Sequence, residues 1–174
     1  MEIREAIAAR KSVRSFLPRP VEEDKIASML EAARMAPSAR NLQEWRFIVI
    51  TDPNTINAIV QQSIPSQQFI ATAPLLFVCC AVTDRAIMTC GHPRYAVDCA
   101  AAVDHMLLAA VSEGLGTCWI GGFRQQPVKD ILGIPAAVEV FALIPTGYAA
   151  DGGIVKKNRK ELDEIVCYGS WKLT

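Results

Sequence analysis

The stretch from Arg94 to Glu113 limits the possible folds of this chain more than any other part of the sequence. Arg94, Asp98, His105 and Ser112 fall on one narrow stripe, at spacings of four, seven and seven residues, and most other positions hold Ala, Val, Leu or Met. A helix that is apolar almost all round is typical of the middle of a structure. Because the chain has only 174 residues and 51% of them are hydrophobic, that middle can include a partner subunit.

Shorter patterns predict the elements around this helix. Residues 75–82 form a continuous apolar run, as expected of a central strand that is covered on both faces. Further strands are expected at 46–51, 117–120 and 138–144, and further helices at 2–9, 22–34, 53–61 and 126–132. Only the connection from 46–51 to 75–82, and the long helix, resemble crossover units. We therefore expect one domain, 1–174, of the α+β or mixed α/β class, with helices on both faces of a small sheet.

Charge and apolar runs bear on the partners and the compartment. The 18 Lys and Arg residues balance 18 Asp and Glu residues, so the basic excess of a sequence-independent nucleic-acid binder is absent. The opening residues, Met1 to Glu5, are too charged for a secretory leader, and the apolar run at 75–82 is far shorter than the ~20 residues of a membrane span. The expectation is a cytoplasmic protein with neither nucleic acid nor membrane as a partner.

The cysteines and histidines do not have metal-site spacing. The six cysteines contain no C-x-x-C pair, and the two histidines do not form H-x-x-x-H. Most of the cysteines lie in apolar sequence, where a free thiol behaves as a small hydrophobe. We expect no metal and structural thiols, with Cys90 exposed in a Gly- and Pro-containing loop.

Glycine-containing motifs of known chemistry are incomplete. Gly114-x-Gly116 follows a helix and enters a strand, which is the reverse of the order in a dinucleotide fingerprint. The spacing from Gly116 to Gly121 lacks the Lys and Ser or Thr of a phosphate loop, and G-x-S-x-G is absent. Nothing in the sequence indicates nucleophilic hydrolysis.

Three polar clusters remain: residues 10–14, with three cations, residues 37–43, rich in hydrogen-bonding groups, and residues 157–159, with two more cations. Each alone is typical of a solvated surface or an ordinary turn. Together with residues 114–123, however, the stretches at 10–16, 36–45 and 157–159 resemble, in order along the whole chain, the flavin-dependent nitroreductase family. Residues 83–93 are too short for the helical insertion of larger members, so the chain resembles the compact branch.

The resemblance implies a fold and a cofactor. The implied fold is a nitroreductase-like three-layer α/β/α structure with a small mixed, mainly antiparallel sheet, in an intertwined homodimer. The implied cofactor is FMN, with NAD(P)H as co-substrate. The implied cofactor-binding residues are Arg10, Lys11, Ser12, Arg14, Pro37, Ser38, Ala39, Asn41, Gly121, Gly122, Lys157 and Arg159.

The resemblance also implies roles for these residues. Arg10, Lys157 and Arg159 would hold the FMN phosphate, since guanidinium forks match phosphate oxygens, and Ser12 would donate to the ribityl chain or the phosphate. Arg14 would lie beside the pyrimidine edge and stabilise the anion of the reduced flavin, which tunes its potential.

Two further segments would complete the cofactor site. A backbone N–H from the Gly121-Gly122 pair would point at flavin N5, where glycine lets the main chain approach closely. The loop containing Pro37, Ser38, Ala39 and Asn41 would reach the flavin of the other subunit, giving two shared sites per dimer. Glu44 departs from the family pattern, which usually has Pro there, and this bears on the shape of that loop and on substrate access.

The expected activity is transfer of a hydride from NAD(P)H through flavin N5 to an electron-poor acceptor, such as a nitroaromatic or a quinone. One slot serves both substrates, which predicts ping-pong kinetics, and no side-chain acid or base is obviously required. The alternatives are a specialised flavin reductase of another substrate, such as an enone or a halogenated aromatic, an FMN carrier or sensor without turnover, and a flavin-free interaction module. The sequence leaves open the physiological acceptor, the choice between NADH and NADPH, and the reactivity of Cys90.

Overall fold

A computed structural model describes residues 1–151 and 157–171, and its centre is a four-stranded sheet. The strands are β1 (Trp45–Ile50), β2 (Leu75–Ala81), β3 (Gly116–Thr117) and β4 (Glu139–Gly147), in the spatial order β1-β2-β4-β3. All three strand pairs are antiparallel. One isolated parallel bridge, between Ser12 and Thr117, places the N-terminal segment beside the β3 edge.

Two details of the predicted sheet were wrong. The connection from β1 to β2 is not a crossover, because the two strands are antiparallel neighbours along their whole length. The strand expected at 117–120 is regular only at Gly116–Thr117, and Ile120 then forms a single bridge to Leu143. A connecting helix of a given length can serve either strand direction, so periodicity alone did not decide between them.

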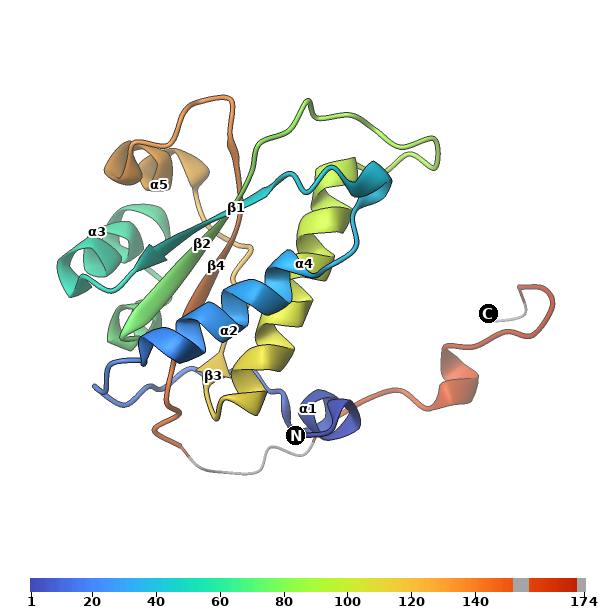
Figure 1. The fold of residues 1–174 in the computed structure, drawn as a ribbon, viewed down its shortest axis with the longest axis horizontal. Coiled ribbons are helices and arrows are strands. Elements are labelled where there is room, and N and C mark those ends of the chain that lie inside the picture. Colours follow the sequence, from blue (N-terminus) through green and yellow to red (C-terminus); the bar gives the residue numbers. More distant parts are fainter. Residues whose placement is uncertain (152–156, 172–174) are drawn as a thin grey trace.

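Helices cover both faces of the sheet, as Figure 1 shows. On one face lie α2 (Glu23–Arg34) and α4 (Arg94–Ser112), and on the other lie α3 (Pro53–Ser63) and α5 (Gln125–Leu132). The remaining helical elements are α1 (Ile3–Ala9), η1 (Ala39–Asn41), η2 (Gln68–Thr72) and η3 (Leu162–Glu164). Alternate residues of β2 enter the two cores: Phe77 packs with α2 and α4, and Val78 packs with α3 and α5. Every residue of β2 is buried, which confirms the expected central strand.

The long helix α4 combines a buried face with exposed apolar residues. By length and composition alone it could cross a membrane, as some core helices of soluble proteins could. Cys99, Val103 and Met106 are buried in the same core as β2, which identifies α4 as a core helix of this fold. Val97, on another face, is half exposed although it is apolar.

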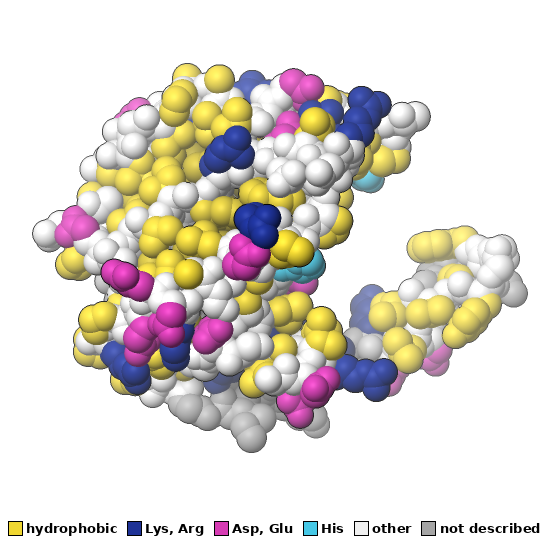
Figure 2. Space-filling view, viewed as in Figure 1, with side chains coloured by type: hydrophobic (Ala, Val, Ile, Leu, Met, Phe, Trp, Pro, Cys, Tyr) yellow, Lys and Arg dark blue, Asp and Glu magenta, His cyan; other side chains and the backbone are white. Residues whose placement is uncertain are grey.

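The C-terminal segment lies apart from the main body in Figure 1. Its apolar residues are largely exposed, among them Tyr168 at 86% and Trp171 at 83%. Figure 2 shows the same segment as an arm with hydrophobic side chains along it. Residues 152–156, between β4 and the predicted cations at 157–159, and residues 172–174 lie outside the described residues.

The cysteines agree with the expectation of structural thiols. Cys79, Cys80, Cys99 and Cys118 are free and buried, and Cys90 is free and exposed. Burial raises the pKa of Cys80 to about 11 and that of Cys99 to about 12. Among the described residues, no group of three or more Cys, His, Asp or Glu side chains is arranged to hold a metal.

Candidate functional site

A cavity of about 460 Å³ lies between residues 10–14, near the N-terminus, and residues 157–159, near the C-terminus. Its lining contains six of the predicted cofactor-binding residues: Arg10, Lys11, Ser12, Arg14, Lys157 and Arg159. Asp151 and Asn158 also line it, and neither was predicted. Of the lining residues that the structure describes, Asp151 alone carries a carboxylate, against five cations, so the cavity suits an anion.

The N-terminal wall of this cavity is set by the end of α1 and by the edge of the sheet. After Ala9 the backbone becomes extended, and the Val13 amide donates to the Thr117 carbonyl at 2.9 Å. The Val13 side chain is buried against Gly116, where an added Cβ would lie 2.5 Å from Val13 Cγ2. Since side chains alternate along extended backbone, Ser12 and Arg14 point away from Val13 and line the cavity.

The C-terminal wall is attached to the N-terminal helix. Lys157 Nζ donates to the Ile7 carbonyl at 2.6 Å, near the negative end of α1. Partial desolvation, and then the positive charges of Arg10 and Arg159, lower the pKa of Lys157. Besides the desolvation, the lowered pKa reflects repulsion among neighbouring cations, which a bound phosphate would relieve.

Cys118 lies beside the predicted residues of this cavity, and the sequence reasoning treated it only as a core thiol. Burial raises its pKa, while the charge of Arg14 and a hydrogen bond with Ser12 act in the opposite direction. The Cys118 thiol therefore lies next to the Ser12 side chain. Cys118 directly follows Thr117, which pairs with Ser12. The sequence did not place Cys118 near the cavity, because this pairing is known only from the structure.

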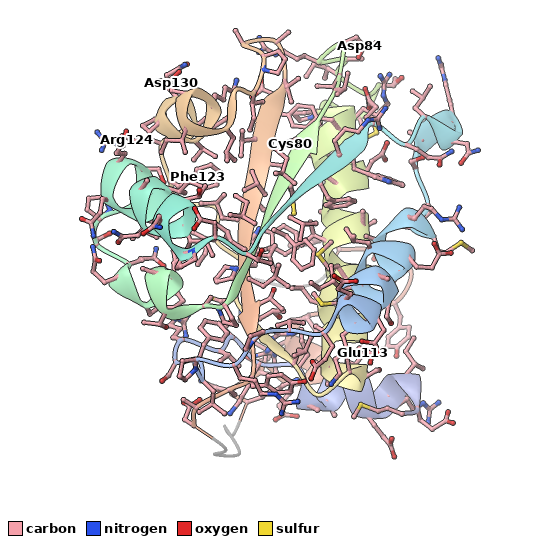
Figure 3. All side chains as sticks on the ribbon, turned by 60° about the vertical axis from the view of Figure 1, so that its left-hand side comes forward. Cys80, Asp84, Glu113, Phe123, Arg124 and Asp130 are labelled. Carbon is pink, nitrogen blue, oxygen red and sulfur yellow. The ribbon has the colours of Figure 1, made fainter. Side chains whose placement is uncertain are left out.

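Gly121 and Gly122 follow the same sheet edge. Before the two glycines, Ile120 and Leu143 exchange two backbone hydrogen bonds of 3.0 Å. After them, the Arg124 amide donates to the Ser63 carbonyl at 3.1 Å. Figure 3 shows Phe123 and Arg124 beside α3. An added Cβ at either glycine would meet no atom within 4 Å, so both backbones are open to a ligand.

A second, smaller cavity of about 200 Å³ lies at Gly121. It is lined by Tyr95, Gly121, Phe123, Gln125, Glu139, Val140 and Phe141. Gly121 is only four positions after Thr117, so the two Cα atoms lie within roughly 14 Å of one another. A ligand that occupies the basic cavity and extends along this edge can reach the glycine pair.

The loop of residues 37–41 lies elsewhere. The Ala39 amide donates to both carboxylate oxygens of Asp98, at 3.1 Å each, near the start of α4. Asp84 marks that same end of α4, because it accepts from Arg94, and Glu113 marks the other end, because it follows the last residue of the helix. Figure 3 shows these two residues at opposite ends of α4. The helix is about 28 Å long, and α1 lies at its Glu113 end. Within one chain, Pro37, Ser38, Ala39 and Asn41 are therefore not brought to the basic cavity.

Comparisons with known proteins bear on the family and the fold of this chain. The model of the nitroreductase family matches residues 7–66 and 62–148. A protein of Archaeoglobus fulgidus, provisionally named NADH dehydrogenase/NAD(P)H nitroreductase, is 32% identical over 83% of this chain and 84% of its own length. The FMN reductase [NAD(P)H] of Bacillus subtilis is 28% identical over 86% of this chain and 67% of its own. The crystal structure of a nitroreductase family protein from Clostridium novyi superposes with a TM-score of 0.81 at 31% identity, over 87% of each chain. The chain belongs to the nitroreductase family.

Proposed function

We propose that this protein is an FMN-dependent oxidoreductase that passes a hydride from NAD(P)H to an electron-poor acceptor, such as a nitroaromatic or a quinone. The oxidoreductase class and FMN with NAD(P)H as co-substrate are supported by the family and by the names of its relatives. The hydride route, the acceptor class and a cytoplasmic location are parts of the proposal. When bound, FMN supplies the chemistry by accepting a hydride at N5 and passing it on.

The observation that carries the proposal is the convergence of cations from both ends of the chain in one cavity. Arg10, Lys157 and Arg159 would bind the phosphate through charge-assisted hydrogen bonds. Lys11 adds positive charge at the rim, and Ser12, which also lines the cavity, would donate to the phosphate or the ribityl chain. The donor set fits the phosphate end of FMN.

The flavin ring would extend from this cavity along the sheet edge. Arg14 lines the cavity close to where the N-terminal segment pairs with β3. Its positive charge would lie beside the pyrimidine edge of the flavin and favour the anion of the reduced flavin. The open backbone at Gly121 and Gly122 would let an amide approach N5, since neither residue has a Cβ in the way. These residues bind and orient the cofactor, and the proposal assigns no proton transfer to any side chain.

The site would be shared in a homodimer. The loop containing Pro37, Ser38, Ala39 and Asn41 would meet the flavin bound by a second copy, because it lies at the far end of α4 from its own chain's cavity. Exposed Ile3 and Ile7 on α1, and Val97 on α4, supply apolar surface that a second copy would cover.

The first experiment is the visible spectrum of the purified protein, followed by rapid mixing with NADH and with NADPH. We expect a yellow protein whose flavin absorbance is lost rapidly on mixing and returns when an acceptor is added. A protein that binds FMN but is not reduced by either nucleotide would be a carrier or a sensor. A colourless protein that takes up no FMN would contradict the proposal.

The phosphate assignment is tested with Arg10→Ala and Arg159→Ala. Each removes a charged hydrogen-bond partner worth about 1.5–3 kcal/mol, so the Kd for FMN should rise about 10- to 150-fold. Arg34→Ala is the matched control, because Arg34 forms an exposed ion pair with Glu31 on α2. An unchanged Kd in both cavity variants would refute the assignment.

A further inference from the structure

Two side chains of α4 hold both ends of the segment from Ala39 to Glu44. Asp98 accepts the Ala39 amide on both carboxylate oxygens, at 3.1 Å each. Arg94 donates from Nε and Nη2 to the two carboxylate oxygens of Glu44, also at 3.1 Å each. Because Arg94 and Asp98 are four residues apart, they lie on the same face of the helix, one turn from each other.

These groups are charged, yet they lie in the interior. Asp98 is 5% exposed, Glu44 is 8% exposed and the Arg94 side chain is 13% exposed. A charge taken out of water is costly unless it is paired and hydrogen-bonded, so an arrangement of this kind serves geometry better than it serves stability. Asp84 extends the pair outward, accepting from Arg94 Nη2 at 2.8 Å.

The segment that they hold has an unusual backbone. Arg40, Asn41 and Gln43 have positive φ angles of 55°, 55° and 50°. Few residues with side chains adopt this left-handed region, although asparagine does so more readily than most, so the surroundings must hold Arg40 and Gln43 in it. Within the loop, Ser38 Oγ accepts the Gln43 amide at 3.1 Å, and Gln43 Nε2 donates to the Asn41 carbonyl at 3.2 Å.

The loop's side chains face outward. Arg40, Asn41 and Gln43 are exposed, whereas the groups that anchor the loop on α4 are buried. Backbone strain that the surrounding structure maintains is typical of functional sites. Because this loop is exposed and its anchors are buried, its shape is expected to serve a contact with another molecule. Its own chain's basic cavity lies at the other end of α4, so that cavity is not what the loop serves.

We propose that Asp98, together with the Glu44–Arg94 ion pair, is a positioning device that holds residues 38–43 in the shape needed by the FMN site of a second copy. The inference rests on the shared site proposed above. It assigns a role to Glu44, the position at which this chain departs from the family pattern, and to Arg94 and Asp98, the first two residues of the polar stripe of α4.

The first test measures the FMN affinity of Asp98→Ala. The exposed Asp104 on the same helix provides the matched control, Asp104→Ala. The Kd for FMN should rise about tenfold or more in Asp98→Ala and stay unchanged in Asp104→Ala. Asp98→Asn keeps one acceptor oxygen for the Ala39 amide, and its Kd should fall between those of the wild type and Asp98→Ala. Wild-type affinity in Asp98→Ala would overturn the proposal.

A mixed dimer shows whether the device acts on the other copy. One chain carries Arg10→Ala and Arg159→Ala, the other carries Asp98→Ala, and two different affinity tags isolate the mixed species. If the loop acts across the dimer, one site combines both defects, and the other joins an intact cavity to an intact loop. The mixed dimer should then bind one FMN with wild-type affinity, although neither homodimer does.

Each result has a distinct reading. If the loop serves its own chain, both sites of the mixed dimer are defective, and absence of a tight site would overturn the inference. If Asp98→Ala does not fold, the mixed dimer is made with Asp98→Asn instead, and the same comparison of FMN affinities applies. Failure of the wild type to bind FMN, or wild-type affinity in the Arg10→Ala, Arg159→Ala chain, would instead contradict the proposed function itself.

Discussion

Gly116 and Gly121 lie on the same edge of the sheet, but a side chain would meet different surroundings at the two positions. At Gly116 an added Cβ would lie 2.5 Å from Val13 Cγ2 and 2.9 Å from Val13 Cβ. Val13 is buried and β-branched, so it cannot move aside by rotating. At Gly121 the Cβ would meet no atom within 4 Å.

The two alanine variants should therefore differ in kind. Gly116→Ala should lower the free energy of unfolding by about 1–3 kcal/mol, because Val13 and the backbone must shift. Gly121→Ala should leave the unfolding of the FMN-free protein within about 0.5 kcal/mol of the wild type but weaken FMN binding, because its methyl group occupies the cofactor's space. Urea unfolding and FMN titration measure the two effects. Weakened folding in Gly121→Ala, with FMN affinity intact, would contradict the assignment of this glycine.

At the scale of elements, the Glu44–Arg94 pair connects the residue before β1 to the first residue of α4. Hydrogen bonds from Arg94 hold the pKa of Glu44 below its ordinary value of 4.5, against the opposing effect of burial. A carboxyl group whose pKa is lowered by folding stabilises the native state above its unfolded pKa. That contribution is lost as the pH falls through the folded pKa.

Acid should therefore loosen this junction in the wild type. Between neutral pH and about pH 3.5, the urea midpoint should fall more in the wild type than in Glu44→Gln, which has no charge to lose at this position. Glu31→Gln is the control. Hydrogen bonds from Arg34 also lower the pKa of Glu31, but this pair lies exposed on α2, where an ion pair contributes little to stability. The midpoint of Glu31→Gln should follow that of the wild type. Equal pH dependence in Glu44→Gln and the wild type would show that the pair does not couple folding to protons.

At the scale of the whole molecule, much apolar surface remains uncovered. A groove of about 330 Å³ runs between α1, α2 and α4. It is lined by Met1, Ile3, Ala6, Ala32, Met35, His105, Leu108, Ala109 and Ser112. The C-terminal arm adds exposed Leu162, Tyr168 and Trp171. Apolar surface on this scale is typical of a chain that associates with another copy.

Sedimentation should accordingly give a dimer at micromolar concentration, and FMN titration should saturate at two molecules per dimer. The Arg10→Ala, Arg159→Ala chain should remain dimeric, because the two side chains line the phosphate cavity and not the apolar groove. A monomer that still holds its flavin would exclude the shared site.

Much of this architecture follows from local patterns. The helix expected at 53–61 begins where the Asp52 side chain accepts from two backbone amides, and the helix expected at 126–132 ends at Gly133 in the left-handed conformation. The apolar run at 75–82 predicted the central strand, and motif order predicted the family. The roles of the cofactor-binding residues stay predictions, although six of them line one cavity.

The sequence by itself determined the helices and the central strand, because caps, glycines and hydrophobic periods act over a few residues. Only the tertiary structure decided that the chain reverses between β1 and β2. It brought residues 10–14 and 157–159, which the family resemblance had assigned to one site, to the same cavity. It also paired Asp98 with Ala39 and Arg94 with Glu44. The physical reason is that such pairings depend on how distant elements pack. A charged residue on an apolar helix has no preferred partner until another element is placed against it.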